Sequence, residues 1–148
     1  MEQKLQILSD ILKRNGYSMT KARKLVFALL EGQEPQSMHA IYLRTNKQID
    51  RASLYRITRI FEQTGIAQRV YVGWKYKIEL TDIFSHHHHH ISCLGCHKLI
   101  AIQEDEQIEK LIQELAVKHQ IVATSHQLEV QGYCQDCQAA GKVSTVSQ

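Results

Sequence analysis

The chain has 148 residues, of which 43% are hydrophobic, and it carries 4 cysteines and 9 histidines. This length suits one ordinary domain or two small ones. No apolar run is as long as a membrane span or a signal peptide, so we expect a cytoplasmic protein with no membrane partner. The net charge of +3 hides an asymmetry between the two halves of the chain. Residues 1–77 hold 14 Lys and Arg against 6 Asp and Glu, whereas residues 78–148 hold 4 Lys and Arg against 9 Asp and Glu. The basic half predicts a polyanion as partner, and chance clustering of solvated charges is the alternative.

Four helices are predicted in the first half of the chain, because apolar residues recur there at helical spacing between typical start and stop residues. Their expected ranges are Leu5 to a stop at Gly16, a Thr20 N-cap to Gly32, Ser37 to Thr45, and an Asp50 N-cap to Gly65. The faces expected to be buried in the second and fourth helices are Ala22, Val26, Leu29 and Leu30, and Leu54, Ile57, Ile60 and Phe61.

The pattern then changes to the alternation that is typical of β-strands. Apolar and polar side chains alternate over residues 67–72 and 75–80 around the turn Gly73-Trp74, which predicts a two-stranded ribbon. Short helices followed by such a ribbon are the layout of a winged helix-turn-helix. We therefore expect an α+β chain whose residues 1–82 form a winged-helix DNA-binding domain.

The fourth helix carries, opposite its apolar face, the side chains that a DNA-reading helix needs. Arginine can pair with guanine or phosphate, serine can contact either, and an aromatic edge can meet a thymine methyl. A solvated cationic face is the alternative interpretation. The candidate DNA-binding residues on this helix are Arg51, Ser53, Tyr55, Arg56 and Arg59, and candidates for phosphate contacts elsewhere are Arg14, Lys21 and Lys75.

The second half, residues 83–148, is predicted to be a β-α-β domain. Strands are expected over residues 88–92 and 98–103, followed by a helix over 105–119 and a long strand over 121–130. The small, polar residues 139–148 predict a disordered tail. The apolar stripe expected on the helix is Ile108, Leu111, Ile112 and Leu115.

Two C-x-x-C pairs, Cys93-Leu94-Gly95-Cys96 and Cys134-Gln135-Asp136-Cys137, carry the strongest chemical signal in this domain. Thiolates at that spacing can approach one tetrahedral ion from a tight turn, and four of them fill the shell of a structural zinc. Two disulfides are the alternative, although reduced cysteines are expected in the cytoplasm. The five histidines His86–His90 add nitrogen donors suited to zinc, iron, nickel or copper, but only some of them can share one ion.

Taken together, these motifs resemble the ferric uptake regulator (Fur) family of bacterial metal-dependent repressors. The likeness covers roughly residues 4–137 in collinear order. It implies a homodimer in which the winged helix reads a double-stranded DNA operator and the C-terminal α/β domain dimerises. The matching pieces are Thr20-x-x-Arg23, Ser53-Leu54-Tyr55-Arg56, Glu79-Leu80-Thr81, the histidine run before Cys93-x-x-Cys96, and His126 followed by Gly132-Tyr133-Cys134-x-x-Cys137.

The resemblance also implies three sets of metal ligands. Strand alternation accounts for the division of the histidine run between two of them, because successive side chains point to opposite faces. Solvent-exposed or core roles remain the alternative for Glu109 and His126, and His86 has no role. The sets are Cys93, Cys96, Cys134 and Cys137 for a structural zinc; Glu79, His88 and His90 for a regulatory ion; and His87, His89, Glu109 and His126 for a second site.

The chain departs from iron-type members of the family. It has Glu34-Pro35-Gln36 where they usually place a histidine, Ala101 in place of an acidic residue, and His89 in place of a common aspartate. It also lacks the hinge cysteine that zinc-type members often supply. Nitrogen-rich ligation without redox-prone thiols favours zinc over Fe(II) or Mn(II) as the regulatory ion.

We therefore expect a metal-dependent transcriptional repressor that controls metal uptake, with zinc as the first candidate and iron, manganese or peroxide responses as alternatives. An enzyme is not expected, because a metallohydrolase needs an acidic base among its histidines and none lies within His86–His90. The paired H-x-E and P-C-x-x-C motifs of zinc deaminases are also absent. A metal-buffering protein is a further alternative, but it would not need Tyr55 or Arg56.

Overall fold

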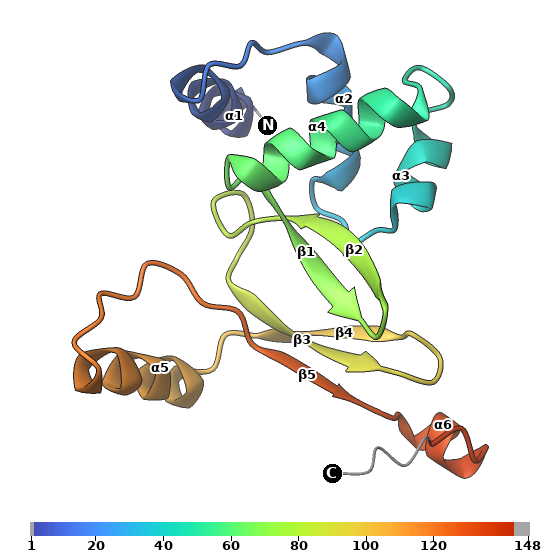
Figure 1. Ribbon diagram of the computed structural model, residues 1–148, viewed down its shortest axis with the longest axis vertical. Coiled ribbons are helices and arrows are strands. Elements are labelled where there is room, and N and C mark those ends of the chain that lie inside the picture. Colours follow the sequence, from blue (N-terminus) through green and yellow to red (C-terminus); the bar gives the residue numbers. More distant parts are fainter. Residues whose placement is uncertain (1, 144–148) are drawn as a thin grey trace. The chain divides into compact units, whose positions relative to one another are not determined.

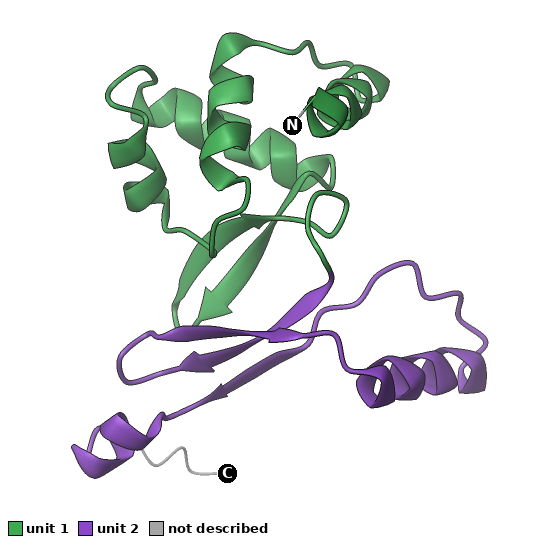
Figure 2. Ribbon diagram, turned by 180° about the vertical axis from the view of Figure 1, so that it is seen from behind, with its two compact units in different colours: residues 1–86 green, residues 87–148 purple. Residues whose placement is uncertain are grey.

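The computed structural model describes residues 2–143, and the chain divides into two compact units (Figure 2). Unit 1 is residues 1–86 and unit 2 is residues 87–148. The boundary thus lies four residues beyond the position 82/83 that composition suggested, and the linking residues up to His86 belong to unit 1. Among the described residues, no helix is long and apolar enough to cross a membrane.

Unit 1 is a helical bundle with a two-stranded ribbon, as the sequence predicted (Figure 1). The strands pair antiparallel, with Ala67 opposite Leu80 and Val72 opposite Lys75. Its elements are α1 (Glu2–Arg14), α2 (Lys21–Leu30), α3 (Met38–Arg44), α4 (Arg51–Gln63), β1 (Ala67–Val72) and β2 (Lys75–Leu80).

Side-chain caps define where α2, α3 and α4 begin. The hydroxyl of Thr20 accepts a hydrogen bond from the N–H of Arg23, and Asp50 caps α4 in the same way. Ser37 caps α3. Such caps satisfy backbone donors that have no partner within the helix. After α4 the chain turns at Gly65, whose φ of 71° lies in the left-handed region that glycine tolerates best.

A single apolar core holds unit 1 together and fixes the ribbon to the helices. Phe27 and Phe61 are fully buried in it, and the ring of Phe84 meets Phe27 edge-on at 4.9 Å. The side chain of Arg69 on β1 forms two parallel hydrogen bonds, of 2.8 and 2.9 Å, with the carboxylate of Glu62 on α4. The ribbon is therefore tied directly to the last turns of α4.

Unit 2 is a three-stranded sheet with two helices. The strand order is β4-β3-β5, in which β3 pairs antiparallel with β4 and parallel with β5. The helix α5 lies in the chain between β4 and β5, which is the predicted β-α-β order. The elements are β3 (His88–Cys93), β4 (Leu99–Gln103), α5 (Glu106–Lys118), β5 (Glu129–Gly132) and α6 (Gln135–Ala139).

Two predictions for unit 2 were wrong in detail. The strand expected over residues 121–130 begins only at Glu129, because β3 pairs with this segment only over residues 90–93. The tail expected from Ala139 begins too early, because α6 extends through Ala139 and Lys142 donates a hydrogen bond to the carbonyl of Cys137. Residues 144–148 lie outside the described residues.

The apolar stripe of α5 is not buried within the described chain. Leu111 is 56% exposed and Leu115 is 47% exposed, while Ile108 and Ile112 are only half-buried. In contrast to the helices of unit 1, α5 has no buried residue. The amphipathic pattern therefore predicted the helix correctly, but the apolar face of this helix is not covered by the described part of the chain.

Candidate metal centres and nucleic-acid interface

Four cysteine sulfurs meet at one end of the sheet in unit 2. Cys93 ends β3, Cys96 follows in the turn to β4, and Cys134 and Cys137 lie at the start of α6. All four Sγ atoms lie within 4.8 Å of one another, and those of Cys96 and Cys134 are 3.8 Å apart. A tetrahedral zinc with Zn–S bonds of about 2.3 Å separates its sulfurs by about 3.8 Å. The spacing thus fits zinc ligands, whereas a disulfide needs about 2.0 Å.

The surroundings of these sulfurs favour a bound cation. The backbone N–H of Cys134 donates a 3.3 Å hydrogen bond to Cys93 Sγ. This bond, together with one from the backbone N–H of Cys96, lowers the pKa of the Cys93 thiol to about 6. Burial raises the pKa of the Cys137 thiol to about 12, so its thiolate needs a positive charge nearby. A zinc ion would supply that charge.

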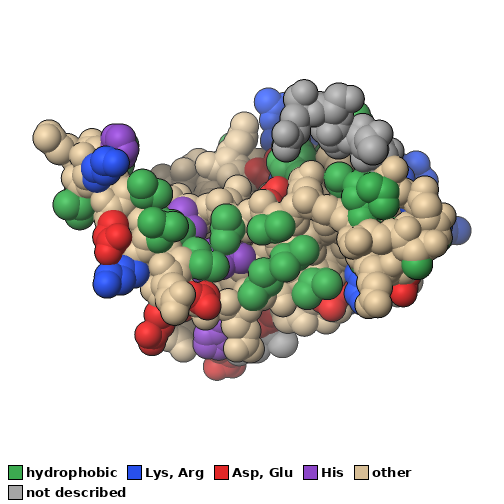
Figure 3. Space-filling view, turned by 90° about the horizontal axis from the view of Figure 1, so that it is seen from below, with side chains coloured by type: hydrophobic (Ala, Val, Ile, Leu, Met, Phe, Trp, Pro, Cys, Tyr) green, Lys and Arg blue, Asp and Glu red, His purple; other side chains and the backbone are tan. Residues whose placement is uncertain are grey.

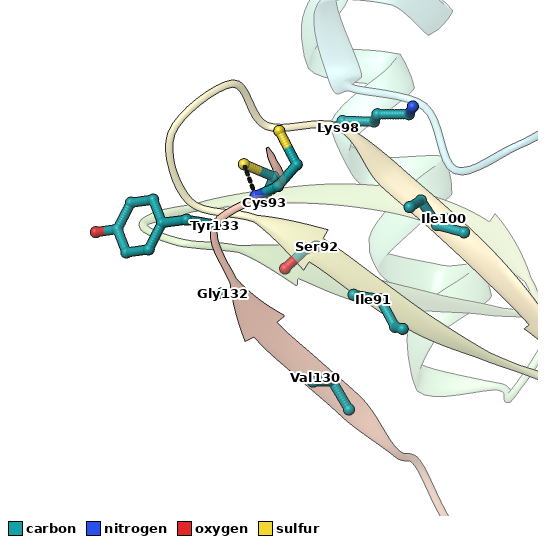
Figure 4. A pocket seen from close by; sticks show the side chains of 9 residues that line it. Ile91, Ser92, Cys93, Lys98, Ile100, Val130, Gly132 and Tyr133 are labelled. Atoms are coloured by element: carbon teal, nitrogen blue, oxygen red, sulfur yellow. Dashed lines mark hydrogen bonds between the residues drawn. The ribbon is translucent and has the colours of Figure 1, made fainter. Parts of the chain in front are cut away.

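An apolar hollow adjoins the cysteine cluster on the sheet (Figure 4). Its volume is about 160 Å³. Ile91, Ile100 and Val130 are neighbours in register across the three strands, and all three are partly exposed. Side chains of residues in register project from the same face of a sheet. The hollow is therefore part of an uncovered apolar face, and its full lining is Ile91, Ser92, Cys93, Lys98, Ile100, Val130, Gly132, Tyr133 and Cys134.

A second cluster brings three histidines and a glutamate together on unit 2. Nε2 of His87 lies 3.0 Å from Nε2 of His126, and Oε1 of Glu109 lies 3.3 Å from His87 and 3.2 Å from each of His89 and His126. Tetrahedral zinc with bonds of about 2.0–2.1 Å separates its nitrogen and oxygen ligands by about 3.3 Å. His87 directly precedes β3, His89 lies in β3, Glu109 lies in α5 and His126 lies in the segment before β5, so one ion bound here would join these three parts of unit 2.

The electrostatics of this second cluster also suit a cation. Burial raises the pKa of the Glu109 carboxyl, but the charges of His126 and His87 and the hydrogen bond with His89 outweigh burial, and the net pKa is lowered. Glu109 is therefore a carboxylate at neutral pH. Imidazole nitrogens around a carboxylate oxygen form a donor set typical of zinc and of other first-row metals.

The third predicted ligand set is divided between the two units. Glu79 lies on β2 of unit 1, where its Oε1 accepts a 2.8 Å hydrogen bond from Gln68 Nε2 on β1. His88 and His90 lie on β3 of unit 2, two residues apart, with ring centroids separated by 4.7 Å. The alternation of β3 thus places these histidines on the face opposite to His87 and His89.

The candidate DNA-binding face of α4 is exposed and basic. Leu54, Ile57 and Phe61 are buried on one side, whereas Tyr55 is 53% exposed on the other. Exposed side chains accompany it there at Arg51, Arg56 and Arg59, and Ser53 is half-buried. The remaining candidates are exposed too: Arg14 at the end of α1, Lys21 at the start of α2 and Lys75 at the start of β2.

Several residues that shape these sites were not predicted from the sequence. Gly95 leaves room for the cysteine cluster, because a Cβ there would lie 2.8 Å from Cys137 Sγ. The ring of Tyr42 lies 4.9 Å from the guanidinium carbon of Arg51 and restrains that side chain. No motif marks either residue, since each role depends on a neighbour from another segment. Asp50 was predicted only as a helix cap, although its side chain is also linked to the basic face of α4.

Comparison with known proteins agrees with this combination of features. A model of the Ferric uptake regulator family matches residues 14–131. The Ferric uptake regulation protein of Escherichia coli K12 is 36% identical over 131 residues, which cover 83% of this chain and 85% of that protein. The protein of the same name from Klebsiella pneumoniae is 34% identical over 144 residues, 90% of either chain.

A solved structure extends the similarity to the whole fold. The Helicobacter pylori ferric uptake regulator, whose structure reveals three functional metal binding sites, has a TM-score of 0.73 and 27% identity. The alignment covers 99% of this chain and 95% of that one. The overall α+β architecture of both units is thus that of a known class of structures.

Proposed function

The chain belongs to the ferric uptake regulator family, and we propose that it is a homodimeric repressor that binds DNA when metal occupies its regulatory sites. Regulators of this family respond to metals, bind DNA and function as dimers; they are not enzymes. The observation that carries the proposal is the exposed basic face of α4 within a winged helix that is joined to a unit with clustered metal ligands. The site of action would be the cytoplasm, where the operator lies.

The DNA interface would centre on α4, with its exposed face in the major groove. Arg51, Tyr55, Arg56 and Arg59 would face base edges and nearby phosphates, because a recognition helix reads DNA with the residues opposite its buried side. Arg14, Lys21 and Lys75 would contact phosphates, which supply affinity and register but carry no sequence information. Unit 1 supports this role through its excess of basic residues.

Metal control would depend on Glu79, His88 and His90 as ligands of one regulatory ion. This part of the proposal rests on the family resemblance and on the alternation of β3. Because the ligands come from both units, an ion bound by all three would restrict the orientation of the winged helix relative to unit 2. The two winged helices of a dimer would then match the spacing of the half-sites, and metal would act by shifting a conformational equilibrium.

Zinc is the first candidate for the regulatory ion and Fe(II) is the second. The two imidazole ligands His88 and His90, with no thiolate beside them, support zinc at the regulatory site, and the 3.0–3.3 Å spacing around Glu109 fits zinc in the second cluster. The names of the relatives support iron, since the proteins from Escherichia coli and Klebsiella pneumoniae are ferric uptake regulation proteins. Both candidates leave the cysteine cluster as a structural zinc site.

A second copy of the chain would cover the apolar face of unit 2. Figure 3 shows hydrophobic side chains gathered on this face of the molecule. The row of Ile91, Ile100 and Val130 is exposed there, and within the described part of the chain β5 is an edge strand that pairs with β3 alone. His89 projects from the same face of β3 as Ile91, so an ion in the second cluster would stiffen the dimer surface.

Fluorescence anisotropy with a duplex selected in vitro from random sequences tests the proposal. The protein, stripped of labile metal by a mild chelator, is titrated with Zn(II), Fe(II) and Mn(II). One of these ions should raise DNA affinity at least about fivefold, the scale of a typical allosteric coupling. His90→Ala should abolish this response, whereas His119→Ala, which changes an exposed histidine outside the clusters, should retain it. Affinity that is unchanged by chelation would contradict metal control.

A further inference from the structure

Three polar side chains are linked by hydrogen bonds along one edge of α4. The hydroxyl of Ser53 donates to Oδ2 of Asp50 at 2.7 Å, and Nη2 of Arg56 donates to the same hydroxyl oxygen at 3.0 Å. The residues are spaced three apart, so they stand one above another on the helix surface. The linkage runs from the N-cap into the predicted DNA-reading face.

The direction of these hydrogen bonds is set by Asp50. Its Oδ1 accepts the backbone N–H of Ser53 at 2.8 Å, so both carboxylate oxygens are engaged by the same residue. A carboxylate can only accept hydrogen bonds, and a hydroxyl has a single hydrogen to donate. The hydrogen of Ser53 is therefore directed at Asp50, and the lone pairs of its oxygen face Arg56.

This geometry changes the role expected of Ser53. Its hydroxyl hydrogen is committed within the protein, so it is not free to be donated to a base. Arg56 uses one of its five N–H donors on Ser53 and keeps the others for DNA. Holding a long side chain in one orientation before binding removes part of the conformational entropy that binding would otherwise cost.

We propose that Asp50 and Ser53 are positioning residues that orient Arg56 for base recognition, and that they contribute to the choice of operator sequence. The proposal rests on the proposed DNA-binding function. The positioning role goes beyond that of a helix cap. It also accounts for an acidic side chain at the DNA-reading end of α4, a place where a carboxylate would repel phosphates. Arg59 serves as a comparison, because it has no such hydrogen bond among the described residues.

The test measures base discrimination rather than affinity alone. A preferred duplex is selected in vitro with the metal-loaded protein, and the affinities for this duplex and for each single base-pair change are compared. Arg56→Gln identifies the base pairs that Arg56 reads. Ser53→Ala should lower discrimination at those same pairs by about three- to tenfold, part of what one good base contact supplies. Ser53→Thr keeps the hydroxyl and should discriminate between bases as well as the wild-type protein.

A second pair of variants separates positioning from capping. Asp50→Ser keeps a good N-cap but has a single oxygen in place of two, so it should lose discrimination at the Arg56 base pairs while circular dichroism stays unchanged. Loss of the Asp50 charge should raise the affinity for every duplex alike. The measured quantity is therefore the ratio of the affinity for the preferred duplex to that for each changed duplex. The double variant Ser53→Ala with Arg56→Gln should discriminate no worse than Arg56→Gln alone.

The outcomes distinguish this inference from the function on which it rests. A wild-type protein that selects no duplex would overturn the proposed function, and the positioning role with it. A wild-type protein that selects a duplex, together with a Ser53→Ala variant that discriminates as well as wild type, would overturn the positioning role alone. So would additive losses in the double variant, or an equal loss caused by Ser53→Ala at the base pairs that an Arg59→Gln variant identifies.

Discussion

At the scale of single residues, Gly95 keeps the four cysteine sulfurs together by having no side chain. A Cβ at this position would lie 2.8 Å from Sγ and 3.0 Å from Cβ of Cys137, closer than atoms approach without displacement. Gly95→Ala should therefore displace one ligand and weaken zinc binding, measured by competition with a chromogenic chelator. Gly132→Ala is the matched control, because a Cβ there meets nothing within 4 Å. Equal zinc affinities in the two variants would contradict this account of the site.

Asp50 offers a second test at this scale, through its ionisation. The hydrogen bonds from the side chain and backbone of Ser53 lower the pKa of the Asp50 carboxyl below its ordinary value of 3.8. A lowered folded-state pKa stabilises the protein above the ordinary value, and this stabilisation is lost as the pH falls through the folded-state pKa. NMR titration should find the pKa of Asp50 raised toward 3.8 in Ser53→Ala. The same pKa in both proteins would mean that the hydroxyl does not interact with the carboxylate.

Residue type and spacing were sufficient to predict the cysteine cluster of unit 2, whereas Glu109 and His126 were assigned to the second cluster only through the family resemblance. The two C-x-x-C pairs lie together, and alternation along β3 separates His87 and His89 from His88 and His90. The sequence could not reveal the roles of Gly95 and Tyr42, because each depends on packing against a residue from another segment. Asp50 shows the same limit, since its capping role is local whereas its link to Arg56 requires the side-chain geometry.

At the scale of elements, α5 is a helix whose apolar stripe is not covered by the described part of the chain. Leu111 is more than half exposed, although the sequence pattern is that of a helix with one buried face. Leu111→Glu should therefore shift the protein from dimer to monomer in sedimentation velocity, because a charge would have to be desolvated at the interface. Gln113→Glu adds the same charge on a neighbouring exposed position and should leave the dimer intact. A dimeric Leu111→Glu variant would place the interface elsewhere.

The segment between α5 and β5 was predicted as a strand because of its apolar residues. Residues 121–128 instead form no regular structure, and Val122 is 88% exposed. Alternation and apolar character cannot reveal whether a neighbouring strand is available for pairing. Here the segment carries His126 to the second metal cluster, a role that depends on tertiary position. The bounds of β1 and β2 were predicted correctly, because those strands pair with each other across a local turn.

Metal should therefore order this segment. One ion held by His126, His87, His89 and Glu109 would anchor the segment to β3 and α5. Amide hydrogen exchange over residues 121–127 should be fast without labile metal and at least about tenfold slower with zinc, since protection reports the free energy of local opening. His126→Ala should remove the slowing but leave exchange in α4 unchanged. Equal exchange with and without zinc would show that the cluster does not hold the segment.

At the scale of the whole molecule, the two units differ in what holds them together. Apolar residues form a continuous buried core in unit 1, including Leu12, Phe27, Phe61 and Ile78. Among the described residues of unit 2, the buried apolar side chains are those of Cys93 and Cys137. Hydrophobic burial is the main favourable contribution to folding, so unit 1 has its own source of stability. We therefore expect unit 2 to depend on bound metal and on a partner subunit.

Complete removal of zinc should therefore unfold the two units to different extents. Binding of a structural zinc contributes directly to the free energy of folding, and no large apolar core replaces it in unit 2. Hydrogen exchange with mass spectrometry should find residues 87–143 unprotected after zinc is removed under reducing conditions, while α2 and α4 keep their protection. Cys134→Ser should reproduce this pattern without a chelator, whereas an exposed change such as Ser125→Ala should not. Loss of protection in both units together would mean that unit 1 depends on unit 2 for its fold, and retained protection in unit 2 would mean that the cysteine cluster is not a structural metal site.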